Sequence, residues 1–256
     1  MIMNQTSNPA LAKDVFTRYR SGASAEVMTM AGTMNKTLIS FLLLLAGAFY
    51  TWSRFFQALD AQEGMRLVMP YLIGGGIGGF ILALVTIFKK EWSAITVPIY
   101  SVLEGLFLGG ISAMVEQQFP TESIVLRAVA LTFGVFFLML FLYRSRIIKV
   151  TNKFRLGVVA ATGGIALVYL LSWIFSFFGL RMGFLFGNSL LSIGISLFVV
   201  AIAALNLVLD FDFIDRGTRA NVPKFMEWYG AFGLMVTLIW LYLEILRLLS
   251  KISSRN

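Results

Sequence analysis

Long apolar runs alternate with short polar connections along almost the whole chain. Each run has about the 20 residues that an α-helix needs to cross the hydrocarbon layer of a membrane. In lipid, backbone polar groups must be satisfied inside the spanning segment, and a helix does this. We therefore predict an all-α integral membrane protein with seven transmembrane helices, at roughly 37–56, 67–88, 95–115, 124–143, 156–178, 189–209 and 228–249.

No connection between these runs is long enough to hold a second folded domain. The predicted organisation is a polar cytoplasmic N-terminal segment over 1–36, one transmembrane domain over 37–249 and a short tail over 250–256. In the N-terminal segment Leu11, Val15 and Tyr19 recur at helical spacing, which fits an amphipathic interfacial helix or a flexible tail equally well. Because no removable signal peptide is evident, the first apolar run should serve as both signal and anchor.

Composition excludes a water-soluble fold. Hydrophobic residues make up 58% of the 256 positions, the mean hydropathy is +0.83 and only 13% of residues are charged, whereas a soluble domain has about 25% charged residues. The net charge of +8 does not indicate nucleic acid, because the basic residues lie in short clusters between apolar runs.

The basic residues predict the orientation in the membrane. Fourteen of the 21 lie in the N-terminal segment and the even-numbered connections, and seven lie on the opposite side. Since cytoplasmic connections carry the excess of Lys and Arg, the N-terminus should be cytoplasmic and the C-terminus outside.

The chain contains neither cysteine nor histidine. This excludes disulfides, thiolate nucleophiles, imidazole bases and the usual zinc and haem sites. An intramembrane aspartyl protease usually has a Gly-x-Gly-Asp motif, and none of the aspartates follows Gly-x-Gly: Asp14, Asp60, Asp210, Asp212 and Asp215. We therefore expect no enzymatic activity and no cofactor.

Glycines cluster within the second apolar run. The stretch 74–79 contains a formal GxGxxG, but a dinucleotide fingerprint needs a soluble strand–turn–helix unit. The spacings Gly74/Gly78 and Gly75/Gly79 instead favour close helix packing. The same interpretation applies to four more glycines: Gly109, Gly110, Gly163 and Gly164.

Glu104 lies near the centre of the third run. An ionisable group at that depth costs about 2.5–3.5 kcal/mol on insertion scales, so it should face the bundle interior and have a partner or water. The pattern leaves two interpretations open: a functional carboxyl, or a protonated carboxyl that is hydrogen-bonded to a neighbouring helix for structural reasons.

Three aspartates mark the end of the sixth run. Asn206 and Asp210 are four residues apart and share a helix face, and Asp210 should lie at the cytoplasmic end of the hydrocarbon layer. Asp212 and Asp215 are interpreted as a solvated helix end beside Arg216. Asp210 is therefore the functional candidate of the three.

The seventh run adds two acidic residues. Glu227 begins it at the cytoplasmic boundary, where it would form a carboxylate pair with Asp210 if both lie at one depth. Glu244 and Arg247 are three residues apart, so they should pair along the helix, with Arg247 reaching the outer interface.

The last two runs resemble a known family. Residues Asn206 to Gly217 and Met226 to Leu249 look like the end of the Bax inhibitor and YccA-like family, also called the transmembrane Bax inhibitor motif family. Glu104-Gly105-Leu-Phe-Leu-Gly109 is similar to that family's apolar segment around a glycine. The stretch from Met28 to Thr37 resembles a bacterial branch.

The resemblance implies a seven-helix bundle with the last helix at its centre. It also implies a pH sensor made of two aspartates, one at the end of the sixth helix and one in the seventh. Asp210 matches the first, because Ile214 follows it by four residues, and the second falls at Thr237, which cannot ionise. Either this sensor is lost, or Glu227, Glu104 or Glu244 replaces the second aspartate.

The function implied is that of a pH-sensitive Ca²⁺ leak channel, which some members are described to be. Its candidate pore or cation-binding residues are Asp210, Glu104, Asn206 and Glu244, with Ca²⁺ as permeant ion and no metal site assigned. The alternative is a non-conducting regulator of a partner membrane protein, such as a membrane protease or a cell-survival factor. The expected location is a bacterial cytoplasmic membrane, with the lipid bilayer and other membrane proteins as partners and no nucleic acid.

Overall fold

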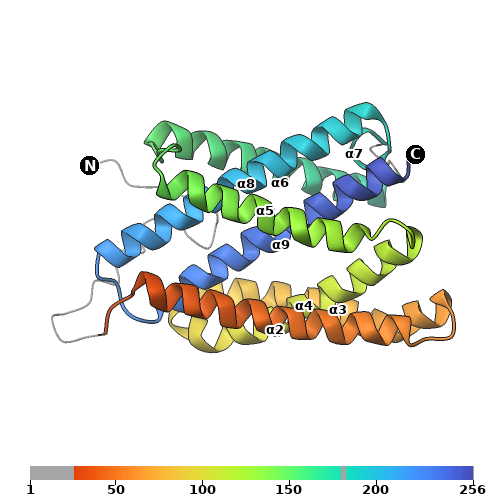
Figure 1. The fold of residues 1–256 in the computed structure, drawn as a ribbon, viewed down its shortest axis with the longest axis horizontal. Helices are drawn as coiled ribbons and strands as arrows, with labels where there is room; N and C mark the ends of the chain where they lie inside the picture. The colour runs from red at the N-terminus through yellow and green to blue at the C-terminus, as the bar shows by residue number, and fades with distance from the viewer. Residues whose placement is uncertain (1–25, 180–182, 256) are drawn as a thin grey trace. The chain divides into compact units, whose positions relative to one another are not determined.

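The computed structural model describes residues 26–179 and 183–255. Within them it contains no strand, and its seven long helices are long and apolar enough to cross a membrane (Figure 1). These helices are α2 (Met30–Phe56), α3 (Ala61–Phe88), α4 (Ser93–Gln118, preceded by the 3₁₀ turn η2, Lys90–Trp92), α5 (Ile124–Arg144), α6 (Asn152–Phe177), α8 (Leu190–Arg219) and α9 (Met226–Ser253). The predicted seven-helix all-α membrane protein is confirmed.

The helices extend beyond the apolar runs. α2 starts at Met30 and α3 at Ala61, each six or more residues before the predicted run, because Thr29 and Asp60 act as N-caps. The Thr29 side chain accepts from the Gly32 amide, and that of Asp60 accepts from the Glu63 amide. α8 continues through Arg219, ten residues past the predicted end at 209. The N-terminal stretch with Leu11, Val15 and Tyr19 lies outside the described residues.

The chain divides into two compact units. Among the described residues, the unit that we call the amino-terminal unit comprises 26–125 and 213–236, and the carboxyl-terminal unit comprises 126–212 and 237–255. Both α8 and α9 contribute residues to each unit. The short helix α7 (Gly183–Phe186) belongs to the carboxyl-terminal unit.

In the amino-terminal unit α4 packs against both α2 and α3. A Cβ added at Gly105 or Gly109 would collide with the backbone of α2 at Leu44 or Ala48. On the other side of α4, a Cβ at Gly75 would lie 2.5 Å from the Leu103 carbonyl oxygen. Glycine thus lets three backbones approach closely, as the spacing predicted.

The glycine prediction fails at three positions. A Cβ added at Gly74, Gly163 or Gly164 would meet no atom of the described residues within 4 Å, so these glycines permit no close helix contact there. Spacing identifies a glycine pair but not the direction in which it points. Gly74 lies on a different face of α3 from Gly75.

In the carboxyl-terminal unit α8 is held by α5 and α6. Phe211 packs its ring against Phe136 and Tyr143 of α5, at centroid distances of 5.6 and 5.9 Å. Asn206 donates a hydrogen bond of 2.8 Å to Thr162 Oγ1 of α6. Aromatic packing and a buried polar contact therefore fix the face of α8 that carries its candidate residues.

The last helix is the most buried of the seven spans. In its most apolar window 61% of residues are buried, compared with 17% for α3, α5 and α6. A large buried share is what a helix enclosed by others requires, whereas the large exposed apolar side chains of the outer helices suit contact with lipid. α9 is therefore the helix whose polar side chains most need partners.

Candidate functional site

Asp210 lies on the buried face of α8. Asp210 is 1% exposed, and Asn206, one turn earlier on the same face, is also buried. Besides its bond to Thr162, Asn206 donates to the Ile202 carbonyl at 2.9 Å. The structure thus places the Asn206–Asp210 face against protein, as the spacing predicted.

The prediction that Asp212 is solvated is wrong. Its Oδ2 accepts a hydrogen bond of 2.8 Å from Arg155 Nη2, and both side chains are largely buried. Arg155 comes from the first turn of α6, so the charge of Asp212 is neutralised by another helix. Asp215 does fit a polar helix end, since it pairs at 2.7 Å with the exposed Arg219 four residues later.

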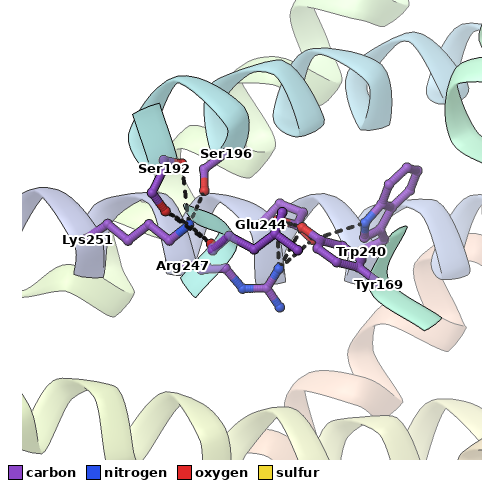
Figure 2. Close-up of polar contacts among 8 residues, drawn as sticks. Tyr169, Ser192, Ser196, Trp240, Glu244, Arg247 and Lys251 are labelled. Atoms are coloured by element: carbon purple, nitrogen blue, oxygen red, sulfur yellow. Dashed lines mark hydrogen bonds and ion pairs between the residues drawn. The ribbon is translucent and has the colours of Figure 1, made fainter. Parts of the chain in front are cut away.

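Glu244 is the centre of a polar cluster in the C-terminal half of α9 (Figure 2). Arg247 Nη1 donates to both carboxylate oxygens, at 3.0 and 3.1 Å, which confirms the pairing expected from their spacing. The Tyr169 hydroxyl of α6 donates to Glu244 at 3.2 Å and accepts from Arg247 at 2.9 Å. The Trp240 indole adds a third donor group at 3.3 Å. Glu244 and Arg247 therefore form a structural ion pair on α9, and their hydrogen bonds to Tyr169 join this helix to α6.

Lys251, one turn after Arg247 on α9, forms a second cluster (Figure 2). Its residue is only 5% exposed. The ammonium donates to the Leu185 carbonyl at 2.6 Å and to the hydroxyls of Ser192 and Ser196, both at 2.8 Å. These acceptors satisfy all three of its donors, which offsets the cost of burying the charge.

In the sequence, Lys251 is only one of the seven basic residues expected on the outer side, and this cluster was not predicted. The available signal was the pair of serines four apart in an otherwise apolar run. Such a pair places two hydroxyls on one helix face, but it does not identify the donor that they receive.

Glu227 binds the start of α2 in the amino-terminal unit. The residue is fully buried. Its Oε1 accepts from the Thr29 amide and hydroxyl, at 2.9 and 2.8 Å, and its Oε2 pairs with Lys36 Nζ. A Cβ at Gly32 would overlap this carboxylate, so only glycine leaves room for it.

Backbone hydrogen bonds reinforce the same contact. The Met28 amide donates to the Val222 carbonyl at 2.7 Å, and the Lys224 amide donates to the Glu26 carbonyl at 3.0 Å. The segment before α2 is thereby joined to the connection between α8 and α9. The pair that the sequence suggests between Glu227 and Asp210 stays a prediction, and within its own unit Glu227 caps α2 and pairs with Lys36.

Glu104 lies in the middle of α4 and is directed at α3. A Cβ at Gly79 would lie 2.6 Å from Glu104 Oε1, so the carboxyl rests on that glycine. The expected partner is missing from the described residues: Glu104 forms no hydrogen bond or ion pair with them. Gly79 makes the space for this carboxyl, and water, the predicted alternative to a protein partner, stays a prediction.

No group of three or more acidic side chains that could hold a metal ion occurs in the part of the chain that the structure describes. Thr237, at the position expected for a second aspartate, is buried in α9.

Comparison with known proteins identifies the family. The model of the family described as Bax inhibitor 1 like matches residues 8–254. The chain belongs to the Bax inhibitor 1 like family. No curated protein and no solved structure matches this chain.

Membership agrees with the resemblance found in the sequence and with the seven apolar helices. Together they identify an integral, multi-pass membrane protein of the Bax inhibitor 1 like family. Within this family member, the buried Asp210 on α8 and the buried Thr237 on α9 are the residues at the two expected sensor positions.

Proposed function

We propose that this protein is a pH-sensitive cation leak channel, with Ca²⁺ as the permeant ion and the protonation of Asp210 as its gate. The observation that carries the proposal is a carboxylate 1% exposed within a membrane-spanning helix of a Bax inhibitor 1 like chain. Ionisable groups inside spanning helices mark ion pathways and proton relays.

The chemistry of Asp210 suits this role. A hard cation such as Ca²⁺ takes oxygen ligands, and an ionised carboxylate in a low-dielectric passage attracts it. Protonation removes that attraction. Asn206 precedes Asp210 by one turn on the same face of α8, and its side chain supplies an amide oxygen at a similar depth.

Other acidic residues of the carboxyl-terminal unit are better explained as structural. Asp212 is tied to Arg155 and Glu244 to Arg247. A carboxylate with a bonded arginine contributes little net charge to a passing cation. We base the gate on Asp210 because it is buried on the face of α8 that it shares with Asn206.

The test is Ca²⁺ flux from liposomes that contain the purified protein, measured from acidic to alkaline pH. Wild type should leak Ca²⁺ with a clear pH dependence. Asp210→Asn, whose side chain is neutral at every pH, should leak at a rate that no longer varies with pH. A pH dependence equal to that of wild type in this variant would refute the assignment.

A second candidate function is a non-conducting regulator of a partner membrane protein. Thr237 favours it, because threonine cannot supply the second ionisable group that the family's sensor uses. The same liposomes discriminate between the two functions: absence of flux at every pH, together with a stable partner recovered by cross-linking in the membrane, would favour the regulator.

We further propose that the protein resides in a bacterial cytoplasmic membrane with its N-terminus inside and its C-terminus outside. The distribution of basic residues supports this orientation.

A further inference from the structure

We propose that Glu104 is a proton-binding site within the membrane, separate from Asp210: a carboxyl group that is protonated at rest and exchanges its proton from the α3–α4 interface. This proposal does not rest on the channel function. It concerns the amino-terminal unit, whereas Asp210 belongs to the carboxyl-terminal unit.

The depth of Glu104 is the first observation. It lies fourteen residues from either end of the apolar span Lys90–Gln118, and the span is entirely helical around it. At the rise of an α-helix, about 1.5 Å per residue, this is about 21 Å from each end. The carboxyl is thus as far from water, along the helix, as the span allows.

The surroundings of the carboxyl are the second observation. Oε1 faces the backbone of α3 at Gly79, and the next turn of α3 packs Gly75 against the Leu103 carbonyl and Phe107. Because Gly79 has no side chain, α3 provides a recess for the carboxyl without offering it a donor. Figure 1 shows α3 and α4 side by side in this part of the molecule.

The charges around this position are the third observation. α3 has no titratable side chain in 72–88, and α2 has none in 37–49. On α4 the titratable neighbour is Tyr100, one turn earlier, whose ring packs on Phe232 of α9. The part of α9 in this unit adds Glu227, which Lys36 and Thr29 already engage, and Tyr229.

Within the described part of this unit, Glu104 forms no ion pair with a basic side chain. An ionised carboxylate without a counter-charge is unfavourable in a low-dielectric environment, and the neutral acid avoids that cost. Glu227 and Glu244 differ in this respect, since each is bound to a basic side chain. Of these three glutamates, the partly buried Glu104 is the one whose surroundings favour a proton.

A protonated carboxyl in lipid has a chemical signature that tests the proposal. Dicyclohexylcarbodiimide is apolar and reacts with the acid form: the carboxyl proton passes to a carbodiimide nitrogen while the carboxylate oxygen bonds to the central carbon. An acyl shift from oxygen to nitrogen then gives a stable N-acylurea. The whole reagent is added and nothing leaves, so peptide mass spectrometry identifies the residue.

We expect the full-length protein in liposomes to be labelled at Glu104 by this apolar reagent, and labelling should fall to background at alkaline pH. A water-soluble carbodiimide should instead label the exposed Glu91 and leave Glu104 unmodified. Labelling in Asp210→Asn should equal that of wild type, which keeps this outcome independent of the channel proposal.

Two alanine variants of α3 provide a matched pair. Gly79→Ala places a methyl group against the carboxyl and should reduce labelling of Glu104, whereas Gly74→Ala meets open space and should leave labelling unchanged. A Ca²⁺-dependent block of labelling would identify a metal-cation site and overturn the assignment to a proton. Absence of label on Glu104, or label that is insensitive to pH, would overturn it as well.

Discussion

Glu227 shows how a single buried carboxylate connects distant parts of the sequence. It is 191 residues from Lys36 and 198 from Thr29, yet it accepts hydrogen bonds from both. Its charge replaces the missing backbone acceptors at the start of α2, where the helix dipole also favours an anion. The residue is therefore expected to contribute to stability.

Replacing Glu227 with Gln should lower the free energy of unfolding by about 1.5–3 kcal/mol, since hydrogen bonds to a charged group are worth this much. The Lys36 ammonium would lose its partner while the shape of the side chain is kept. Thermal unfolding in one detergent measures the effect. Glu91→Gln, at an exposed position, is the control and should unfold like wild type. Equal melting temperatures for both variants would contradict the anchoring role.

Thr237 stands where the family resemblance places the second aspartate of a pH sensor. Thr237→Asp adds an ionisable group at a buried position of α9. With Asp210 it should form a pair that shares protons and titrates as a unit, so the pH at which Ca²⁺ flux changes should shift. Thr237→Asn is the control, because asparagine has the size of aspartate and cannot ionise. A flux profile that is the same for the Asp and Asn variants would show that this position plays no part in the pH response.

At the residue scale, the sequence predicted contacts that lie within one helical turn. The Glu244–Arg247 pair follows from a spacing of three. The Arg155–Asp212 pair joins residues 57 apart, and Lys251 meets Ser192 across 59 residues. Helical periodicity contains no information about such partners, because they depend on which helices pack together.

Helix packing in the amino-terminal unit depends on where glycines point. Gly105→Ala should separate α2 from α4, because its Cβ meets the Leu44 backbone, which cannot rotate away. We expect a loss of about 1–3 kcal/mol, the usual cost of overpacking. Thermal unfolding of the purified protein gives the measurement.

Gly163→Ala is the matched control on α6. Its Cβ meets nothing within 4 Å, and alanine is favoured over glycine in a helix by up to about 1 kcal/mol. The two variants should therefore change stability in opposite directions. A loss in both, or in neither, would contradict the difference in packing.

At the element scale, the sequence predicted every spanning helix but not its ends. Apolar runs mark the part of a helix that suits lipid, whereas helices continue through polar residues when caps and ion pairs support them. The pattern Asp60-Ala-Gln-Glu63 was a usable start signal for α3. The extension of α8 had no such signal. The sequence around Asp212 suggests a solvated helix end, and it does not reveal the ion pair with Arg155.

The orientation of the whole molecule in the membrane is a prediction from its basic residues. The chain has no cysteine, so single cysteines can be introduced and labelled selectively. Thr121→Cys, in the exposed connection after α4, should react with a membrane-impermeant maleimide from outside intact cells. Ser145→Cys, after α5, should react only once the membrane is permeabilised. The reverse pattern would invert the topology.

The central claim at this scale is that protonation of Asp210 controls cation flux through the molecule. The most direct measurement compares the pH dependence of Ca²⁺ efflux from liposomes for wild type, Asp210→Asn and Asp215→Asn. Asp215 is the control, because it pairs with the exposed Arg219 at the end of α8. We expect Asp215→Asn to keep the pH dependence of wild type and Asp210→Asn to lose it. An unaltered pH dependence in Asp210→Asn would contradict the account.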